Sequence, residues 1–478
     1  MVDVKLNDCF DVTRPDVRAA FPCRLGRVSL LGAAVSFATG SAVDLFYRRK
    51  VIDGSIPTTG PVLLVANHPN ALLDPVLVTN STRRRVRMLA KAPLFSMPGI
   101  SLLVKGLDCL PVYRSKDGAD TSSNAETFRA VEEALVGGSC VLIFPEGISH
   151  DEPTVQPLKT GAARMAIGAW RRGATDIVVV PVGLTYADKL RYRSTAAVDI
   201  GPPIVVADFI AADGTVDVDD RDAARRLTDA IFAGLLKETV NVQSWEDMRL
   251  LDAVDAIWRQ RDPERVRRIK SLADGVTLLR AEAPDELDAF RSRLSLWVDR
   301  VAALGLSPRD LGEEQLQAQQ RPARAASFIV RHILAAIVGL PIAVTGALFW
   351  APPFWAVHLL WRLMGVERDT GATVKVLGSL VFFPLWWLTA IVGLVVGVGG
   401  AGGVAAAIAL GAAAPAAGLM TRHFFRRRLF AVRQLLGVLR LAARGSLGQE
   451  IRTERDALCA ELDAFSARVD ARQATTTT

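Results

Sequence analysis

The fold is decided by two short stretches, Asn67-His68-Pro69-Asn70-Ala71-Leu72-Leu73-Asp74-Pro75 and Phe144-Pro145-Glu146-Gly147, each of which follows an apolar run, residues 62–66 and 140–143. Continuous apolar runs of this length, closed by Pro, Gly or Asn, are typical of buried parallel strands. Open α/β sheets bind ligands at the carboxyl ends of such strands. We therefore expect the polar side chains of both stretches to lie at one edge of a sheet.

Working outward, residues 51–210 are expected to form one α/β domain, a mixed sheet flanked by helices. Apolar runs alternate there with helical stretches, notably residues 125–136 and 162–171. Such alternation predicts a sheet with helices on its faces. The strand candidates are residues 62–66, 86–90, 109–112, 141–144, 177–182 and 197–200.

The composition indicates a membrane partner. Of the 478 residues, 50% are hydrophobic, and the formal net charge is +7. The basic clusters stand beside apolar segments, which favours phospholipid headgroups over nucleic acid as the anionic partner. The five cysteines are scattered without a CxxC pair, which is typical of reduced, structural thiols.

The carboxyl-terminal third predicts membrane spans, each of which needs roughly 20 apolar residues. Residues 333–350 precede Ala351-Pro352-Pro353 and a further apolar run, which predicts either one span with a re-entrant piece or a hairpin. Residues 376–398 form a second span and residues 402–420 a third. The Arg-rich cluster at residues 422–428 predicts a cytoplasmic end. We therefore expect an integral membrane protein whose α/β domain lies on the cytoplasmic face.

The rest of the chain divides by composition. Residues 25–46 are small and apolar and end at a basic triplet, so we expect a helix in or on the membrane; the alternative is a helix that packs on the α/β domain. The predicted segments around the α/β domain are an N-terminal segment at 1–50, a helical module at 211–325, a transmembrane region at 326–425 and a charged C-terminal helix or tail at 426–478.

The first stretch offers a pair of residues suited to base catalysis. His68 follows a strand and precedes a proline, so it is expected in a turn, with Asp74 near the start of the next helix. A carboxylate that folds back can hold the imidazole in one tautomer, and such a histidine can take a proton from a hydroxyl. The alternative is a structural one, a turn histidine beside a helix-capping aspartate.

Three further pieces favour the functional interpretation. Arg114 ends a strand candidate, and Arg is suited to forked contact with phosphate. Glu146 ends another and can accept hydrogen bonds from hydroxyl groups, and Val180-Pro181-Val182-Gly183 closes a further apolar run. Together these pieces resemble the glycerolipid acyltransferase family, which includes glycerol-3-phosphate and lysophosphatidate acyltransferases. The resemblance covers residues 45–205 and all four motif positions of the family.

The resemblance implies a role for each matching residue. It implies that His68 is the base and Asp74 the acid that orients it. It also implies a set of substrate-binding residues: Arg114 at the phosphate of the acceptor, Glu146 and Gly147 in the acceptor motif, Ser149 and Lys159 as looser candidates near the phosphate, and Pro181 bordering the acyl site.

One departure from the usual family pattern points to a particular branch of the family. Five residues separate His68 from Asp74, where the usual pattern has four. This spacing and the C-terminal spans look like the branch of fungal glycerol-3-phosphate/dihydroxyacetone-phosphate acyltransferases and their bacterial relatives. The resemblance thus implies acyl transfer from acyl-CoA or acyl carrier protein to glycerol 3-phosphate or a related glycerol phosphate in phospholipid biosynthesis.

Other functions stay open at this stage. One alternative is a lysophosphatidate acyltransferase, and another is a non-catalytic membrane scaffold that binds lipid. A hydrolase would ordinarily need a nucleophile or metal set, and the sequence holds neither GxSxG nor HExxH. We expect no cofactor or metal beyond the acyl donor, which is a co-substrate, and no nucleic-acid partner.

Overall fold

A computed structural model describes most of the chain from residue 37 to residue 476. Within these limits the residues not described are 42, 45, 72, 97–99, 113–123, 187–188, 190–193, 211–220, 243, 259–264, 312–321, 365–367 and 444. The predicted membrane helix at 25–46 therefore lies largely outside the described residues.

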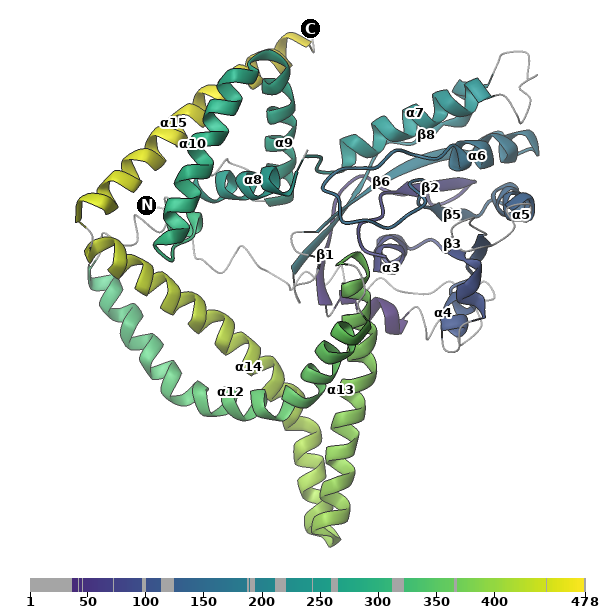
Figure 1. Ribbon diagram of the computed structural model, residues 1–478. Coiled ribbons are helices and arrows are strands. Elements are labelled where there is room, and N and C mark those ends of the chain that lie inside the picture. Colours follow the sequence, from purple (N-terminus) through teal and green to yellow (C-terminus); the bar gives the residue numbers. More distant parts are fainter. Residues whose placement is uncertain are drawn as a thin grey trace.

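One mixed sheet forms the centre of the α/β domain (Figure 1). Within the described residues its strand order is β1-β7-β6-β2-β5-β3-β4, and β8 pairs with β6. All neighbours are parallel except β6 with β7 and β6 with β8. The strands are β1 (Tyr47–Asp53), β2 (Val62–Ala66), β3 (Val86–Lys91), β4 (Leu110–Val112), β5 (Cys140–Ile143), β6 (Val178–Tyr186), β7 (Ser194–Ile200) and β8 (Ile204–Val205).

All six predicted strands are present, and two more strands join them. The structure adds β1 at one edge of the described sheet and the two-residue β8. β1 carries Arg48, Arg49 and Lys50, so its composition does not read as a buried strand. β6 continues four residues past the predicted end at Val182, to Tyr186.

Alternate residues of the central strand divide the core into two layers. Leu63 and Val65 of β2 belong to one cluster, which α5 (Asn124–Val136), α6 (Gly161–Arg171) and α7 (Arg221–Glu238) cover. Leu64 and Ala66 belong to the other, together with the short helix α3 (Leu73–Thr79). Burial on both faces explains why β2 is apolar throughout.

Two segments that the sequence placed outside the α/β domain contribute to these layers. Leu227, Ile231 and Leu235 of α7 are buried against the sheet, although residues 211–325 were predicted as a separate helical module. Val43 and Phe46, at the described end of the predicted membrane helix, are buried in the layer that contains α3.

A second helical layer is assembled from distant parts of the chain. It comprises α8 (Trp245–Ile257), α9 (Arg265–Glu282), α10 (Pro284–Ala303) and the C-terminal helix α15 (Gly445–Thr476), which lies along α10 in Figure 1. Ile451, Leu458 and Phe465 of α15 share one apolar cluster with Leu294 and Trp297 of α10. The C-terminal segment therefore completes the helical module.

Among the described residues, three helices have the length and composition to cross a membrane, at Gly339–Met364, Val374–Val398 and Gly400–Thr421. They belong to α12 (Pro322–Met364), α13 (Arg368–Val398) and α14 (Gly400–Ala443). Many of their large apolar side chains are exposed, Leu348, Leu363 and Val396 among them, which suits contact with lipid.

The predicted break at Pro352-Pro353 is wrong. α12 is one continuous helix with Pro341, Pro352 and Pro353 inside it, so the region forms neither a hairpin nor a re-entrant piece. Figure 1 shows α12 bent along its length. Proline bends helices without ending them where neighbouring helices support the freed backbone groups, and α13 and α14 both pack on α12.

The first residues of α13 connect the membrane helices to the α/β domain. Val376 is buried in the same apolar cluster as Leu73 and Leu77 of α3. The layer of the sheet that contains α3 therefore lies against the start of a candidate membrane span.

The contact between β6 and the end of α7 gives a stability prediction. A Cβ at Gly183 would lie 1.9 Å from the backbone oxygen of Glu238, so Gly183→Ala must push strand and helix apart. We expect it to lower the free energy of unfolding by about 1–3 kcal/mol, as overpacking of a core does. The measurement is the thermal unfolding midpoint of the purified full chain in detergent.

The matched control is Gly161→Ala at the start of α6. Its Cβ would meet only Phe128, at 3.8 Å, so the midpoint should stay within a degree or two, roughly the effect of a tolerated surface change. Equal midpoints for the two variants would contradict the close approach at Gly183.

Candidate active site

The turn after β2 is held in place by Asn67. Its Oδ1 accepts a hydrogen bond from the amide of Leu184 at 2.7 Å, and its Nδ2 donates to the carbonyl of Leu184 at 3.0 Å. The buried side chain thus continues the pairing between β2 and β6 by one residue beyond the strand. His68 follows directly, so its position relative to the sheet is set by this pair of hydrogen bonds.

His68 and Asp74 meet as the spacing predicted. Nδ1 of His68 lies 2.9 Å from Oδ2 of Asp74, and the carboxylate side chain is 0% exposed while the imidazole is 19% exposed. A carboxylate can only accept here, so Nδ1 carries the proton and Nε2 keeps its lone pair. No described residue forms a hydrogen bond to Nε2, so this atom is available to take a proton.

Two further donors hold the Asp74 carboxylate. The amide of Asn70 donates to Oδ2 at 2.7 Å, and the hydroxyl of Tyr186 donates to Oδ1 at 2.5 Å. Burial, and then the negative charge of Asp74, raise the pKa of Tyr186 well above its usual value. The phenol therefore stays protonated and remains a donor across the physiological pH range. With His68, these groups compensate the cost of burying the carboxylate.

The plane of the imidazole is set by Phe144, the residue that follows β5. The two rings stack with centroids 4.0 Å apart and planes 15° apart. The second predicted motif therefore supports the first through packing as well as through hydrogen bonds.

Glu146 uses both carboxylate oxygens inside the protein. Oε1 accepts a hydrogen bond from the amide of His68 at 3.3 Å, and Oε2 pairs with Nε2 of His150. The amide of His150 donates in turn to the carbonyl of His68 at 3.2 Å. Glu146 is 3% exposed, so in this structure it joins the two loops and is not open to solvent.

Gly147 and Lys159 lie together beside this loop. Gly147 has φ +71°, and a Cβ there would be 2.8 Å from Nζ of Lys159. The positive φ favours glycine, whereas the flexible end of Lys159 could move away from a Cβ. The exposed Lys159 lies beside the Glu146 loop, where its amide donates to the carbonyl of Pro145 at 2.9 Å, and its role near the acceptor phosphate stays a prediction.

The other predicted site residues differ in their placement. Oγ of Ser149 accepts a hydrogen bond from the amide of Ala71 at 3.0 Å, so it supports the turn between His68 and Asp74. Pro181 lies within β6 opposite Val65, where its ring packs against Gly234 of α7, and it is not brought to the His68–Asp74 pair. Arg114 lies outside the described residues.

A cavity of about 300 Å³ lies beside the turn that carries His68, although neither His68 nor Asp74 lines it. His150, Tyr186 and Lys189 line it together with Asn67 and Pro69. Nζ of Lys189 donates to the carbonyl of Pro69 at 2.8 Å and forms an ion pair with Asp151. The residues that line the cavity thus include a histidine, a tyrosine and a lysine whose polar groups are bonded to Glu146, Asp74 and Asp151 respectively.

Sequence reasoning missed Tyr186, His150, Asn70 and Tyr47. Nδ2 of Asn70 donates to the hydroxyl of Tyr47 at 3.0 Å, and the ring of Tyr47 lies 5.3 Å from that of Tyr186. Of these four residues, only Asn70 could have been suspected from the sequence, because it lies between His68 and Asp74. Tyr47 and Tyr186 lie on distant strands, and only the sheet brings them together.

Two of the described thiols, Cys109 and Cys140, are poorly suited to nucleophilic attack. Burial raises the pKa of Cys109 and of Cys140 to about 12. Both remain protonated near neutral pH, and the thiolate is the reactive form of cysteine. Within the described residues, no group of three or more His, Cys, Asp or Glu side chains has a metal-binding arrangement.

The α/β domain is similar in sequence to known acyltransferases. The family model described as Acyltransferase matches residues 48–185. Glycerol-3-phosphate O-acyltransferase 2 of Saccharomyces cerevisiae is 35% identical over 154 residues, which are 31% of this chain and 20% of the yeast protein. An uncharacterized acyltransferase of Schizosaccharomyces pombe is 21% identical over 430 residues, 70% of this chain and 62% of that protein. The chain thus spans less than two thirds of either relative.

Among solved structures, the crystal structure of a 1-acyl-sn-glycerophosphate acyltransferase from Thermotoga maritima is similar at a TM-score of 0.30. It shares 18% sequence identity, and the similarity covers 42% of this chain and 77% of that chain.

The hydrogen bond between Tyr186 and Asp74 gives a second prediction. Tyr186→Phe leaves Oδ1 of a buried carboxylate without its donor, which should cost about 1–3 kcal/mol of stability. We expect a lower thermal unfolding midpoint for the full chain in detergent.

A double-mutant cycle isolates this hydrogen bond. In an Asp74→Ala background the acceptor is absent, so adding Tyr186→Phe should have little further effect on the midpoint. An equal loss in both backgrounds would show that the hydroxyl acts through something other than Asp74.

Proposed function

We propose that this protein, whose residues 48–185 form an acyltransferase domain, moves a fatty acyl group from acyl-CoA or acyl carrier protein to a hydroxyl of glycerol 3-phosphate or a related glycerol phosphate. The observation that carries the proposal is His68, with Nδ1 held by the buried Asp74 and Nε2 without a partner among the described residues. The choice of acceptor is supported by the yeast relatives, which are named for glycerol-3-phosphate O-acylation.

The reaction follows from the state of the imidazole. The acceptor hydroxyl gives its proton to Nε2 of His68 as its oxygen attacks the thioester carbonyl. The tetrahedral intermediate then collapses, the carbon–sulfur bond breaks, and the imidazolium returns the proton to the departing thiol. Asp74 stabilises the imidazolium through Nδ1 while the charge is present.

The transfer is direct in this mechanism. Cys109 and Cys140, whose pKa values are raised to about 12, do not form an acyl-enzyme. Glu146 holds the backbone of His68, and its partner His150 forms part of the cavity wall. Arg114, on the sequence argument, contacts the phosphate of the acceptor.

The position of α3 suits substrates that come from a bilayer. Asp74 lies in α3, whose residues Leu73 and Leu77 share an apolar cluster with Val376 of α13. The catalytic pair is thus close to the start of a candidate membrane span. The Arg-rich cluster at residues 422–428 supports placing this face in the cytoplasm.

The first test removes the base. His68→Ala should reduce acyl transfer by about 10²–10⁴-fold, the usual contribution of a positioned base, while the protein still inserts and purifies like wild type. Transfer of a radiolabelled acyl group in reconstituted vesicles measures the rate. The matched control is His358→Ala in α12, which replaces a histidine of a candidate span and should keep the wild-type rate. A His68→Ala rate equal to wild type would end the assignment.

The second test identifies the acceptor. Among glycerol 3-phosphate, dihydroxyacetone phosphate and lysophosphatidate, we expect glycerol 3-phosphate to give the highest kcat/KM. Arg114→Ala should raise the KM of the acceptor by about 10–100-fold, because a charge-assisted contact to phosphate is lost. An unchanged acceptor KM with weaker binding of the acyl donor would reassign Arg114, and a preference for lysophosphatidate would favour the alternative acceptor.

A further inference from the structure

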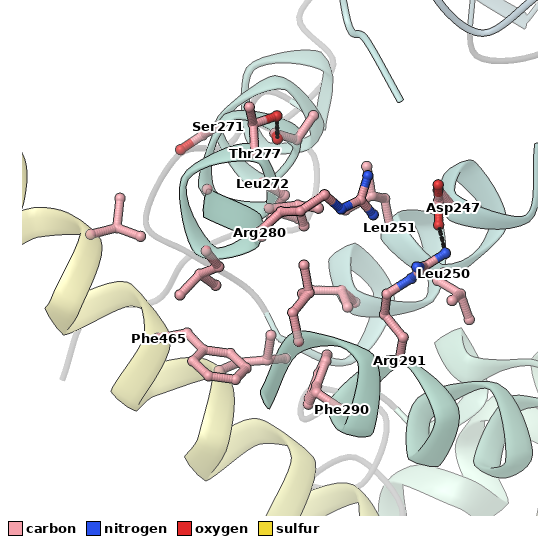
Figure 2. Close-up of a pocket in the computed structure, with 18 of the residues that line it drawn as sticks. Asp247, Leu250, Leu251, Ser271, Leu272, Thr277, Arg280, Phe290, Arg291 and Phe465 are labelled. Carbon is pink, nitrogen blue, oxygen red and sulfur yellow. Dashed lines mark hydrogen bonds and ion pairs between the residues drawn. The ribbon is translucent and has the colours of Figure 1, made fainter. Parts of the chain in front are cut away.

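A second and larger cavity lies in the helical module, away from His68. Its volume is about 870 Å³, it is partly open to solvent, and α8, α9, α10 and α15 line it (Figure 2). Thr154 lines both this cavity and the smaller one beside the turn that carries His68, but none of the predicted site residues lines the larger cavity. The sequence analysis and the proposed reaction leave this space unexplained.

The walls of the cavity are mostly apolar. Leu287, Phe290 and Leu294 of α10 and Leu462 and Phe465 of α15 form one buried part of its wall, in which the rings of Phe290 and Phe465 pack edge to face with centroids 5.5 Å apart. Protein interiors are normally close-packed, and water has few partners along an apolar wall. An apolar space of this size is therefore suited to an apolar occupant.

One charged group in the wall has no partner among the described residues. Arg280 of α9 makes no ion pair and no side-chain hydrogen bond there, and its side chain points into the cavity in Figure 2. The other arginine of the wall, Arg291, is paired with Asp247 and also lies 3.4 Å from Asp288. Arg280 therefore supplies an unmatched positive charge.

The polar and apolar groups are separated within the cavity. Figure 2 shows Arg280 directed toward the side on which Asp247 and Arg291 lie, and the rings of Phe290 and Phe465 on the other side. The remaining wall carboxylate, Asp463, is exposed and accepts a hydrogen bond from the indole of Trp258 at 2.6 Å. The space is thus amphipathic, with a cationic end and an apolar end.

We propose that this cavity binds a single-chain lipid with an anionic head, whose head pairs with Arg280 and whose acyl chain fills the apolar part of the space that α8, α9, α10 and α15 line. The volume falls in the range of about 300–1,000 Å³ that is usual for small-molecule sites. A guanidinium forms forked, charge-assisted hydrogen bonds with a carboxylate or phosphate. α15 follows α14, which contains a candidate membrane span, so a bilayer is the source of the ligand.

The test uses the full chain in phosphatidylcholine nanodiscs with a photoactivatable palmitic acid as the probe. After irradiation and proteolysis, mass spectrometry locates the labelled peptides. We expect labels in α8, α9, α10 and α15, and we expect excess palmitate to suppress them, whereas excess monopalmitoylglycerol, which has no charge, should not.

Two variants and one control connect the label to the cavity. Arg280→Gln removes the charge and should lower labelling by about 10-fold or more, the loss expected for one charge-assisted hydrogen bond. Gly275→Leu fills the cavity from α9, where a Cβ meets only Val469 at 3.9 Å, and should also lower labelling while leaving the protein folded. Arg249→Gln removes a half-exposed arginine of α8 that pairs with Asp299, outside the cavity wall, and should label like wild type.

Several outcomes would overturn the proposal. They are labels confined to the spans α12, α13 and α14, the absence of cavity labels in the wild-type chain, equal labelling of wild type and Arg280→Gln, and equal suppression by the charged and the neutral competitor. The thermal unfolding midpoint of Gly275→Leu should stay at or above that of wild type. A loss of labelling in this variant then comes from the filled cavity and not from misfolding of the protein. The readout is binding, so it is independent of whether the proposed acyl transfer is correct.

Discussion

The site depends on one buried carboxylate. Asp74 is fully enclosed, and three parts of the chain satisfy it: the ring of His68, the backbone amide of Asn70 and the hydroxyl of Tyr186. An unpaired charge in such a place would be costly, so the three donors must be present together. The same contacts that make burial tolerable also fix the imidazole, and the stability of the turn and the orientation of the base therefore have one origin.

The mixed sheet is the structure that brings those donors together. β2 and β6 are parallel, and β6 extends far enough beyond the end of β2 to carry Tyr186 over the turn. β5 ends beside β2, so Phe144 stacks on His68 and Glu146 reaches its backbone. The contacts come from β6 and from the segments that follow β2 and β5, so the sheet fixes the geometry of the site.

The candidate membrane helices and the helical module both make packing contacts that involve other parts of the chain. Val376 of α13 joins the core next to α3, and α15 returns from the membrane region to complete the module around the larger cavity. The loop that carries His150 is tied to that module, since the amide of Val242 donates to the carbonyl of Pro153 and Oδ1 of Asn241 accepts from the amide of Val155 at 3.2 Å. Thr154, between them, borders both cavities.

The sequence by itself determined the local features: six strands, three apolar helices and the meeting of His68 with Asp74. Apolar runs and a six-residue separation are properties of neighbouring residues, so they can be read along the chain. Only the tertiary structure decided that the basic segment at Tyr47–Asp53 is a strand, that α12 continues through Pro352, and that Tyr186 and α15 pack where they do. These outcomes depend on contacts between residues far apart in sequence, such as the 112-residue separation of Asp74 and Tyr186, and no local pattern encodes such contacts.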